Sequence, residues 1–543
     1  MCPPDGEAQH KMGMMMATVR EATYTLLRAL GMTTVFGNPG STELPFLQDF
    51  PDDFTYVLGL QESVVLGMAD GYAQGRGRAA LVNLHTTAGL GNAMGAIVTA
   101  YHNRSPLVIT AGQQDRRQLA LEPLLSGDLV ELAKPYVKWS HQPGRPQDVP
   151  AAIARAYHLA MQEPQGPVFV SVPMDDWAAE AAPLDPAAHE VVYRTAPDPV
   201  ALARVARALQ EARQPAIVAG AEVDRARAWN AVVALAERAR AAVWADPIGS
   251  RAGFPQDHAL FRGHLAPAQA LLAGQLAEYD VVLVLGAPAF LYYPYVPGPT
   301  VQPGTHLFHI TTDPDEAARA AVGVSLVGDV GLAARRLIDL LGEAARPAPA
   351  ARPAPAAPEA TTPLSVAYVM QSLAAALPVG AVLVDESISS KSTLNRYIRV
   401  NQPGGYYTSA SGGLGFAMPA AVGLQLAVPE RRVVCVIGDG SSMYAIQALW
   451  SAARYNAAVA YVVVNNGQYA ILKGFGALLG ASGVPGLDVP GIDLVSVARG
   501  LGVAGEAVER PEALEGALER ALSGERPYLV NIIVDPTVPS LLG

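Results

Sequence analysis

Oxygen-bearing side chains follow two apolar runs near the end of the chain. The run 433–437 leads into the string GDGSS, and the run 460–464 leads into NNGQ. The gap between the two runs has room for a helix, so both are predicted to be parallel strands that end at one crevice. The Asp439 carboxylate, the Asn466 amide oxygen and a main-chain carbonyl suit the octahedral oxygen shell of a hard divalent cation. Glycines there let main-chain N–H groups approach a diphosphate. The sequence therefore predicts a diphosphate and cation site, with Asp439, Asn466 and Gln468 as the metal-binding residues.

Short apolar, β-branched runs alternate with helical patterns along the whole chain, and this alternation is typical of parallel α/β sheets. We therefore predict an α/β fold of three doubly wound parallel-sheet domains. The runs lie at 33–36, 56–60, 80–84, 107–110 and 168–172 in the first third, at 216–219, 242–244, 281–285 and 306–310 in the middle, and at 382–384, 433–437, 460–464 and 529–534 in the last third.

The segment 344–363, which reads AARPAPAARPAPAAPEATTP, marks a boundary. Its composition predicts a semi-rigid, extended connector that neither packs a core nor continues a helix. We expect a first domain at 17–190, a central α/β domain at 191–343 and a last domain at 364–543. Residues 1–16 are predicted to form a flexible N-terminal tail.

Composition narrows the class of protein. The 543 residues suggest about three domains, and a net charge of -11, from 38 basic and 49 acidic residues, shows no basic stripe for a nucleic acid. One of the two cysteines, Cys435, lies within an apolar run and is predicted to be buried rather than disulfide-bonded. No apolar stretch reaches the length of a membrane span. We expect a soluble, cytoplasmic protein that binds neither nucleic acid nor membrane.

The two strand-end motifs together resemble the thiamin diphosphate (ThDP) signature, and the chain is similar to benzoylformate decarboxylases along nearly its whole length. The strings that carry the resemblance are GNPGSTELPFL from Gly37, LQESVVLGMADGYA from Leu60, GGLGFAMPAAVG from Gly412 and VPGLDVPGID from Val484. The resemblance implies a pyruvate decarboxylase-like architecture with pyrimidine-binding, central and diphosphate-binding domains in that order. It also implies ThDP with Mg²⁺, or Ca²⁺ in its place, and a homotetramer, a dimer of dimers, with active sites between subunits.

The activity implied by the resemblance is non-oxidative decarboxylation of a 2-oxo acid to an aldehyde and CO₂ through a cofactor-bound enamine. The substrate would be benzoylformate or a related aryl or aliphatic 2-oxo acid, and ligation of the acyl unit to a second aldehyde, which yields a 2-hydroxy ketone, would be an accompanying outcome.

Four residues are candidates for catalysis. Glu62 alone is typical of a helix start, but in its motif it matches the glutamate that contacts the cofactor's pyrimidine ring. Ser41 alone predicts an N-cap for a helix beginning near Thr42, and the family's serine meets the substrate carboxylate here. Without the resemblance, His85 is predicted to be a structural residue at a strand end. Its match to the family's histidine implies acid–base catalysis. Tyr293 stands where the family has a second catalytic histidine.

The remaining candidates line the cofactor and the substrate. Leu414 matches an apolar wedge that bends the cofactor, and Gly412 would offer its carbonyl to the cofactor's amino group. The predicted cofactor-binding residues are Glu62, Ser387, Ser389, Gly412, Leu414, Asp439, Gly440, Ser441, Asn466, Tyr469 and Ile471. The predicted substrate pocket is formed by Ile388, Thr408, Ile471, Leu472 and Phe475. Three of these depart from the family pattern: Ile388 replaces a threonine, Thr408 an aromatic residue and Ile471 an alanine.

Three other hypotheses remain. A dinucleotide-dependent dehydrogenase could be argued from Gly89, Gly91 and Gly95, or from the run 281–286, although the first glycine spacing is one residue too long. An acetohydroxyacid synthase-like carboligase would share the cofactor. A non-catalytic paralogue kept for assembly is disfavoured because it would have no reason to keep Glu62, Asp439 and Asn466.

Overall fold

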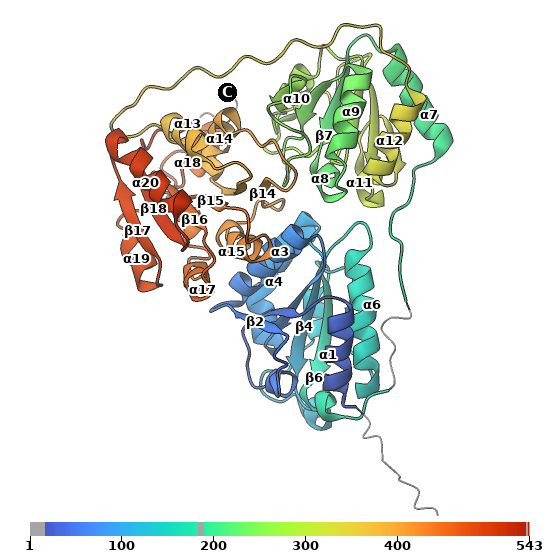
Figure 1. Cartoon of the computed structure of the whole chain (residues 1–543), viewed down its shortest axis with the longest axis vertical. Helices are drawn as coiled ribbons and strands as arrows, with labels where there is room; N and C mark the ends of the chain where they lie inside the picture. The colour runs from blue at the N-terminus through green and yellow to red at the C-terminus, as the bar shows by residue number, and fades with distance from the viewer. Residues whose placement is uncertain (1–16, 183–188, 539–540, 542–543) are drawn as a thin grey trace, which may run out of the picture.

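Three six-stranded parallel sheets follow one another along the chain. The structure is a computed structural model that describes residues 17–182, 189–538 and 541, so the predicted tail at 1–16 lies outside the described residues. In Figure 1 the first sheet lies at the bottom, the central sheet at the upper right and the third at the upper left, each covered by helices. The prediction of three doubly wound α/β domains is confirmed.

The first sheet has the strand order β2-β1-β3-β4-β6-β5. The strand order reverses between β1 and β3, so a crevice opens at their carboxyl ends. Its strands are β1 (Thr34–Gly37), β2 (Thr55–Leu58), β3 (Ala80–Leu84), β4 (Leu107–Gln113), β5 (Ser140–His141) and β6 (Val168–Pro173), and its helices are α1 (Val19–Ala29), α2 (Leu44–Leu47), α3 (Glu62–Arg76), α4 (Thr86–Asn103), α5 (Leu129–Ala133) and α6 (Val149–Met161).

The central sheet has the order β12-β11-β10-β7-β8-β9. This is the strand order of dinucleotide-binding sheets, with its reversal between β7 and β10. The strands are β7 (Pro215–Ala219), β8 (Ala242–Ala245), β9 (Phe261–His264), β10 (Val281–Leu285), β11 (His306–Thr311) and β12 (Val324–Val327), and the helices are α7 (Pro199–Glu211), α8 (Ala221–Arg225), α9 (Trp229–Ala239), α10 (Gln269–Gln275), α11 (Pro314–Arg319) and α12 (Val330–Leu340).

The third sheet, in the order β14-β13-β15-β16-β18-β17, repeats the connectivity of the first. Its reversal point lies between β13 and β15. The strands are β13 (Val382–Glu386), β14 (Tyr406–Thr408), β15 (Val433–Gly438), β16 (Ala460–Asn465), β17 (Ala504–Val508) and β18 (Tyr528–Ile533), and the helices are α13 (Val366–Ala376), α14 (Lys391–Tyr397), α15 (Ala417–Ala427), α16 (Asp439–Ser442), α17 (Ala448–Arg454), α18 (Ala470–Leu479), α19 (Leu494–Gly500) and α20 (Pro511–Ser523).

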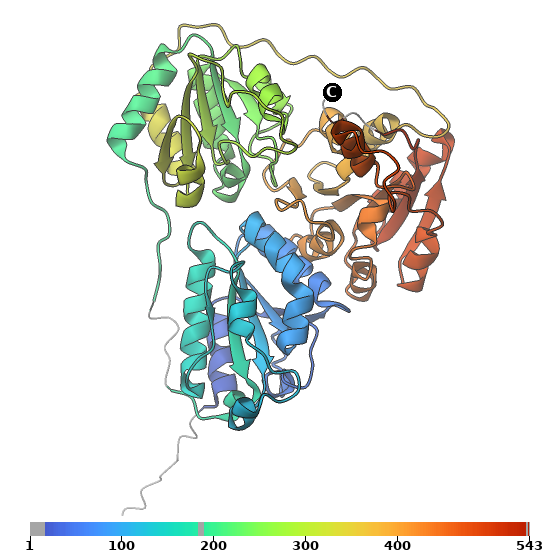
Figure 2. The ribbon, with the colours of Figure 1, turned by 180° about the vertical axis from the view of Figure 1, so that it is seen from behind.

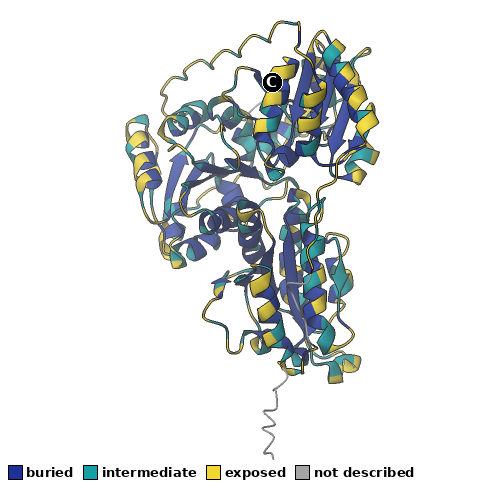
Figure 3. Cartoon of the chain, turned by 45° about the vertical axis from the view of Figure 1, so that its right-hand side comes forward, coloured by how far each residue is buried: buried dark blue, intermediate teal, exposed yellow. Residues whose placement is uncertain are grey.

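The segment 344–363 contains no helix or strand and runs over the top of the molecule from α12 to α13 (Figure 2). Figure 3 shows that the strands are buried while the connector and the outer helix faces are exposed. Arg346 ties the start of the segment to the central domain by donating to the carbonyls of Ala239 and Leu209. We retain 17–190, 191–343 and 364–543 as proposed domain limits. No helix of the described residues is long and apolar enough to cross a membrane.

Helices α3 and α15 join the first and third domains through glycines. A Cβ at Gly71 would lie 2.1 Å from the Ala420 carbonyl oxygen, and a Cβ at Gly423 would lie 1.8 Å from the Met68 carbonyl oxygen. The two backbones can approach this closely only without side chains. One apolar core, which includes Val65 of α3, therefore continues from one domain into the other.

We expect Gly71→Ala to destabilise the protein. The added methyl group would meet backbone atoms, and overpacking of this kind costs about 1–3 kcal/mol, which outweighs the better helix propensity of alanine. The measurement is the free energy of unfolding in urea. Gly274→Ala is the matched control, because that helical glycine has open space around its Cβ position. An equal or higher stability of Gly71→Ala would contradict the packing described above.

Candidate active site

The predicted diphosphate and cation residues come together beyond β13, β15 and β16. Asp439 begins α16 directly after β15, and the backbone amides of Asn466 and Gly467, after β16, contact its carboxylate. From the first turn of α18, the Ile471 amide donates to the Ser389 hydroxyl at 3.0 Å, which links the segment after β16 to the segment after β13. The crevice at this strand reversal is thus lined by both predicted strand-end motifs and by Ser389.

The donor set fits a hard divalent cation with a diphosphate. Burial raises the pKa of Asp439, while neighbouring backbone amides oppose the rise, and a cation would offset the same cost. The side chain of Gln468 is engaged elsewhere, since it donates to the Pro536 carbonyl and accepts from Lys473. Gln468 can therefore offer a cation only its main-chain carbonyl. A Cβ at Gly440 would lie 2.5 Å from the Tyr469 ring, so the turn accepts no side chain there.

The glycine loop 412–415 is anchored by a residue that the sequence analysis missed. Glu386, at the end of β13, accepts hydrogen bonds from the backbone amides of Gly415, Phe416 and Ala417 at 2.7–2.8 Å. Burial raises its pKa to about 7, although these three donors pull the pKa down. Leu414 lies directly before this anchor, and Gly412 is exposed with a φ of +72°. No local pattern distinguishes Glu386 from an ordinary strand residue.

Two of the predicted site residues, Ser387 and Thr408, have hydroxyls that are already hydrogen-bonded within the protein. Ser387 and Thr408 are buried and donate to the side chain and the carbonyl of Asp385, respectively. The Thr408 hydroxyl is therefore not free for a substrate, although its position stays next to the site. Ser441 lies in α16 beside Asp439.

In the first sheet, Ser41, Glu62 and His85 surround the β1–β3 reversal. Glu62 begins α3, and its two carboxylate oxygens accept from the side-chain amides of Asn38 at 3.3 Å and Asn92 at 3.1 Å. Asn92 and Leu414 both line a cavity of about 220 Å³ between the first and third domains. The chain thus brings the surroundings of Glu62 and the predicted wedge to one cavity.

The helix predicted near Thr42 is present, but Ser41 is not its N-cap, so that alternative role for Ser41 is wrong. Helix α2 begins at Leu44, and Ser41 is exposed in a turn. The reason is that the side chains of Thr42 and Glu43 point inward and bond to each other and to His85, which holds this stretch in the turn. The Ser41 hydroxyl therefore caps no helix.

Comparison with known proteins identifies the family. The thiamine pyrophosphate enzyme family matches the chain in three parts: its N-terminal TPP binding domain at 17–132, its central domain at 202–337 and its C-terminal TPP binding domain at 389–532. The benzoylformate decarboxylase of Pseudomonas aeruginosa is 46% identical over 95% of this chain and 99% of its own length.

The chain belongs to the benzoylformate decarboxylase-like ThDP enzymes.

Two further relatives outline that family. The solved structure of the Rhodococcus jostii RHA1 thiamine diphosphate-dependent 4-hydroxybenzoylformate decarboxylase has a TM-score of 0.93 and 46% identity, and it covers 96% of this chain and 100% of that chain. A putative acetolactate synthase large subunit of Mycobacterium tuberculosis is 31% identical over 94% of this chain and 97% of its own length. The prediction of a ThDP-dependent 2-oxo acid decarboxylase is confirmed at the level of the family.

Tyr293, which stands where the resemblance implies a catalytic histidine, contacts a predicted pocket residue. It lies in the loop after β10 of the central sheet, and its ring is 4.9 Å from the ring of Phe475 in α18. Tyr293 is 64% exposed. On the same helix Leu472 is exposed and Ile471 half-buried. The central domain therefore contributes one wall beside the third domain's pocket residues.

The crevice of the central sheet is filled by protein. Glu222, just after β7, accepts from the hydroxyl of Thr311 and from the amide and hydroxyl of Thr312. A buried carboxylate at this reversal point repels the pyrophosphate that a dinucleotide would place there. The glycines Gly89, Gly91 and Gly95 lie inside helix α4 rather than in a phosphate-binding turn before it. Both grounds for a dehydrogenase are thereby removed.

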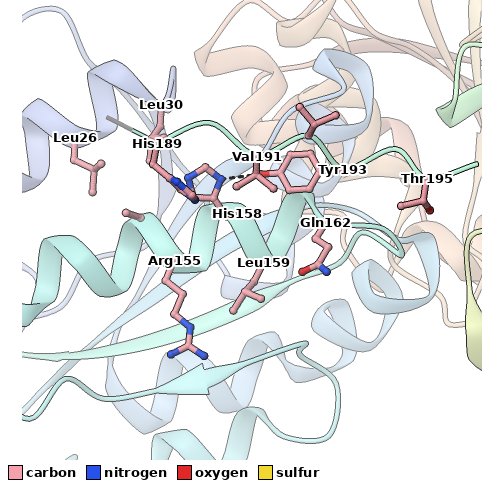
Figure 4. Close-up of a pocket in the computed structure, with 12 residues that line it drawn as sticks. Leu26, Leu30, Arg155, His158, Leu159, Gln162, His189, Val191, Tyr193 and Thr195 are labelled. Atoms are coloured by element: carbon pink, nitrogen blue, oxygen red, sulfur yellow. Dashed lines mark hydrogen bonds between the residues drawn. The ribbon is translucent and has the colours of Figure 1, made fainter. Parts of the chain in front are cut away.

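A cavity of about 550 Å³ lies away from these residues, between α1, α6 and the extended segment 189–195 (Figure 4). His158 and Tyr193 hydrogen-bond to each other at its edge. None of the predicted site residues lines it, and most of its lining side chains are apolar.

We expect Asp439→Ala to abolish metal-dependent ThDP binding, because a diphosphate without its cation faces uncompensated charge. The measurement is calorimetric titration of ThDP into apoprotein with Mg²⁺ and with a chelator. Glu512→Ala, an exposed change on α20 of the same domain, is the control. Unchanged ThDP affinity in Asp439→Ala would remove Asp439 from the metal site.

Proposed function

We propose that this protein uses ThDP and Mg²⁺ to decarboxylate benzoylformate or a related aryl or aliphatic 2-oxo acid. The observation that carries the proposal is the meeting of Asp439, Asn466 and Ser389 beyond the strands of the third sheet. In addition, Leu414 and Asn92, which donates to Glu62, line one cavity. The high identity to enzymes named for benzoylformate and 4-hydroxybenzoylformate supports an aryl substrate.

The residues that would hold the cofactor divide into two groups. Asp439, Asn466 and the Gln468 carbonyl would hold Mg²⁺, and Gly440 and Ser441 the diphosphate. Glu62 would contact the pyrimidine ring, Leu414 would support the cofactor as an apolar wedge, and Gly412 would offer its carbonyl to the cofactor's amino group. When bound, ThDP supplies the electron sink for the electron pair released as the carboxylate leaves as CO₂.

Two residues of the first domain would act on the substrate itself. The exposed Ser41 hydroxyl has no partner among the described residues and is free to donate to the substrate carboxylate. His85 is partly exposed, with its side chain at 19%, and can exchange a proton with the reacting oxygen or carbon. We thus assign carboxylate binding to Ser41, after β1, and proton transfer to His85, after the neighbouring strand β3.

The pocket supports a choice among acyl groups. Ile388 and Ile471 present β-branched aliphatic side chains, and Phe475 and Tyr293 present rings. We propose that activity toward aliphatic 2-oxo acids, measured relative to benzoylformate, is higher than in a typical benzoylformate decarboxylase. One methylene of fit in such a pocket is worth about 1–3 kcal/mol, which is enough to reorder substrates. A carboligase remains the second candidate: Tyr293 replaces a histidine, which slows protonation and favours ligation to a second aldehyde.

We also propose that the chain forms a homotetramer, a dimer of dimers, in the cytoplasm. Near the site the loop after β4 exposes Leu121 by 81% and Leu124 by 87%, and α18 exposes Leu479 by 76%. A contiguous exposed apolar patch marks a contact surface, and we propose that these leucines belong to one. A second copy would cover them and complete a site formed by two subunits. The buried free Cys435 fits a reducing compartment.

Glu62→Gln is expected to bind ThDP and Mg²⁺ but to lose most decarboxylase activity, since a glutamine amide is a poor proton partner for a ring nitrogen. CO₂ release from a panel of aryl and aliphatic 2-oxo acids measures the activity, and the same panel tests the proposed function. Glu131→Gln, an exposed change in the same domain, is the control. Activity of Glu62→Gln within about twofold of wild type would contradict the role, given that acid–base assistance is worth about 10²- to 10⁴-fold.

Tyr293→His is expected to release aldehyde faster and to form less 2-hydroxy ketone. An imidazole exchanges protons near neutrality more readily than a phenol. The measurement is the ratio of ligated product to free aldehyde, with kcat on benzoylformate. Tyr295→His is the control, because Tyr295 lies in the same loop and is 82% exposed. If neither quantity changes in Tyr293→His, Tyr293 is only a wall of the pocket.

A further inference from the structure

His85 is held by a carboxylate that the sequence analysis did not single out. The Glu43 side chain is fully buried, and one of its oxygens lies 2.8 Å from Nδ1 of His85. That oxygen also accepts from the Gly40 amide at 2.9 Å. The other oxygen accepts from the Thr42 hydroxyl at 2.8 Å and from the Gly112 amide at 2.9 Å. All the acceptor positions of this carboxylate are thus used.

These contacts decide which nitrogen of His85 carries the hydrogen. Two backbone amides and a hydroxyl already donate to this carboxylate, so it acts as an acceptor on all sides and Nδ1 donates to its remaining position. Thr42 lies 3.2 Å from the same nitrogen, but its hydrogen goes to Glu43, and its oxygen can only accept from Nδ1. The neutral ring is therefore the Nδ1–H tautomer, with the lone pair on Nε2. The nitrogen left for chemistry is Nε2.

The backbone on both sides of the ring restricts its position. A Cβ at Gly40 would lie 2.2 Å from Nδ1 of His85, so the turn packs directly against the imidazole. The next residue, Thr86, is fully buried with a φ of +39°, a strained value for a β-branched residue. Strain of this kind persists where the surroundings over-determine a conformation, and it concentrates at functional sites. The ring is therefore held by packing as well as by hydrogen bonds.

We propose that Glu43 is a positioning residue that holds His85 in the Nδ1–H tautomer with Nε2 presented to the substrate. The inference rests on the proposed function, because it assigns the orientation of that reaction's acid–base group. Glu43 itself, which is buried behind His85, touches neither substrate nor cofactor and acts only through the imidazole.

Glu43→Gln tests this role. The glutamine keeps the size of the side chain but brings an NH₂ group that cannot accept from an amide, a hydroxyl or Nδ1–H. If the NH₂ group faces His85, the ring rotates or moves its hydrogen to Nε2, which removes the lone pair from the substrate side. If it faces Gly112 and Thr42 instead, the Gly112 amide loses its acceptor and the carbonyl oxygen that remains on Nδ1 is no longer charged. Acid–base assistance is worth about 10²- to 10⁴-fold, and we expect Glu43→Gln to lose about 10- to 100-fold in kcat with little change in KM.

A double-mutant cycle with His85→Ala separates positioning from a general structural role. We expect Glu43→Gln to cause no further loss of kcat when His85 is absent, because its only route to the reaction is then gone. An equal loss in both backgrounds would overturn the proposal. Glu222→Gln, which neutralises a buried, hydrogen-bonded carboxylate of the central domain, is the control for neutralisation itself.

A second cycle uses thermal unfolding of the apoprotein and needs no activity. Glu43→Gln and His85→Ala should together lower Tm by less than the sum of the single changes, because both break the same contact. Additive changes would overturn the contact. If the wild type decarboxylates no acid of the panel but this cycle is non-additive, the proposed function fails while the Glu43–His85 coupling stands.

Thr42→Val keeps the test available should Glu43→Gln not fold. The valine has nearly the same shape and removes one donor to Glu43 while leaving the carboxylate in place. We expect a smaller loss of kcat than in Glu43→Gln, and none when His85 is absent. A loss of kcat that persists in the His85→Ala background would count against the proposal as well.

Discussion

Two helices from different sheets, α3 and α15, touch backbone to backbone, and the placement of the site depends on this contact. Gly71 and Gly423 allow the approach. The two helices run in the same direction, as the neighbours along the contact show: Gly67 faces Pro419 and Gly75 faces Ala427. Parallel packing puts both N-termini at the same end. Glu62 begins one helix and the glycine loop precedes the other, so the contact brings Asn92, which donates to Glu62, and the predicted wedge Leu414 to one cavity.

The first and third sheets share one strand order, and each presents its functional residues at its own reversal point. The first supplies Ser41, Glu62 and His85, and the third supplies the residues suited to a diphosphate and a cation. The central sheet has a different order, and its crevice is occupied by Glu222. Its contribution to the site is instead a loop that carries Tyr293. Under the proposed function, the three domains would divide cofactor binding, proton transfer and the pocket wall among them.

Buried carboxylates organise each of these crevices. A buried charge is tolerated only when hydrogen-bonded, so each one holds the loops that donate to it. Glu386 holds the turn after Leu414, Glu222 holds the segment after β11, and Glu43 holds the turn at Gly40 together with His85. Glu62 differs, because its partners are two side-chain amides from separate segments.

The sequence by itself determined thirteen of the eighteen strands of the described residues, the connector and the strand-end motif of Asp439 and Asn466. These features depend on local periodicity and on the residues that directly follow a strand. The five strands that it missed, β5, β9, β12, β14 and β17, all lie at sheet edges. The start of α2, the role of Glu43, the anchor at Glu386 and the contact between Tyr293 and Phe475 were decided by the tertiary structure. Each depends on groups that are far apart in the chain and meet only when the sheets pack, so no local pattern records them.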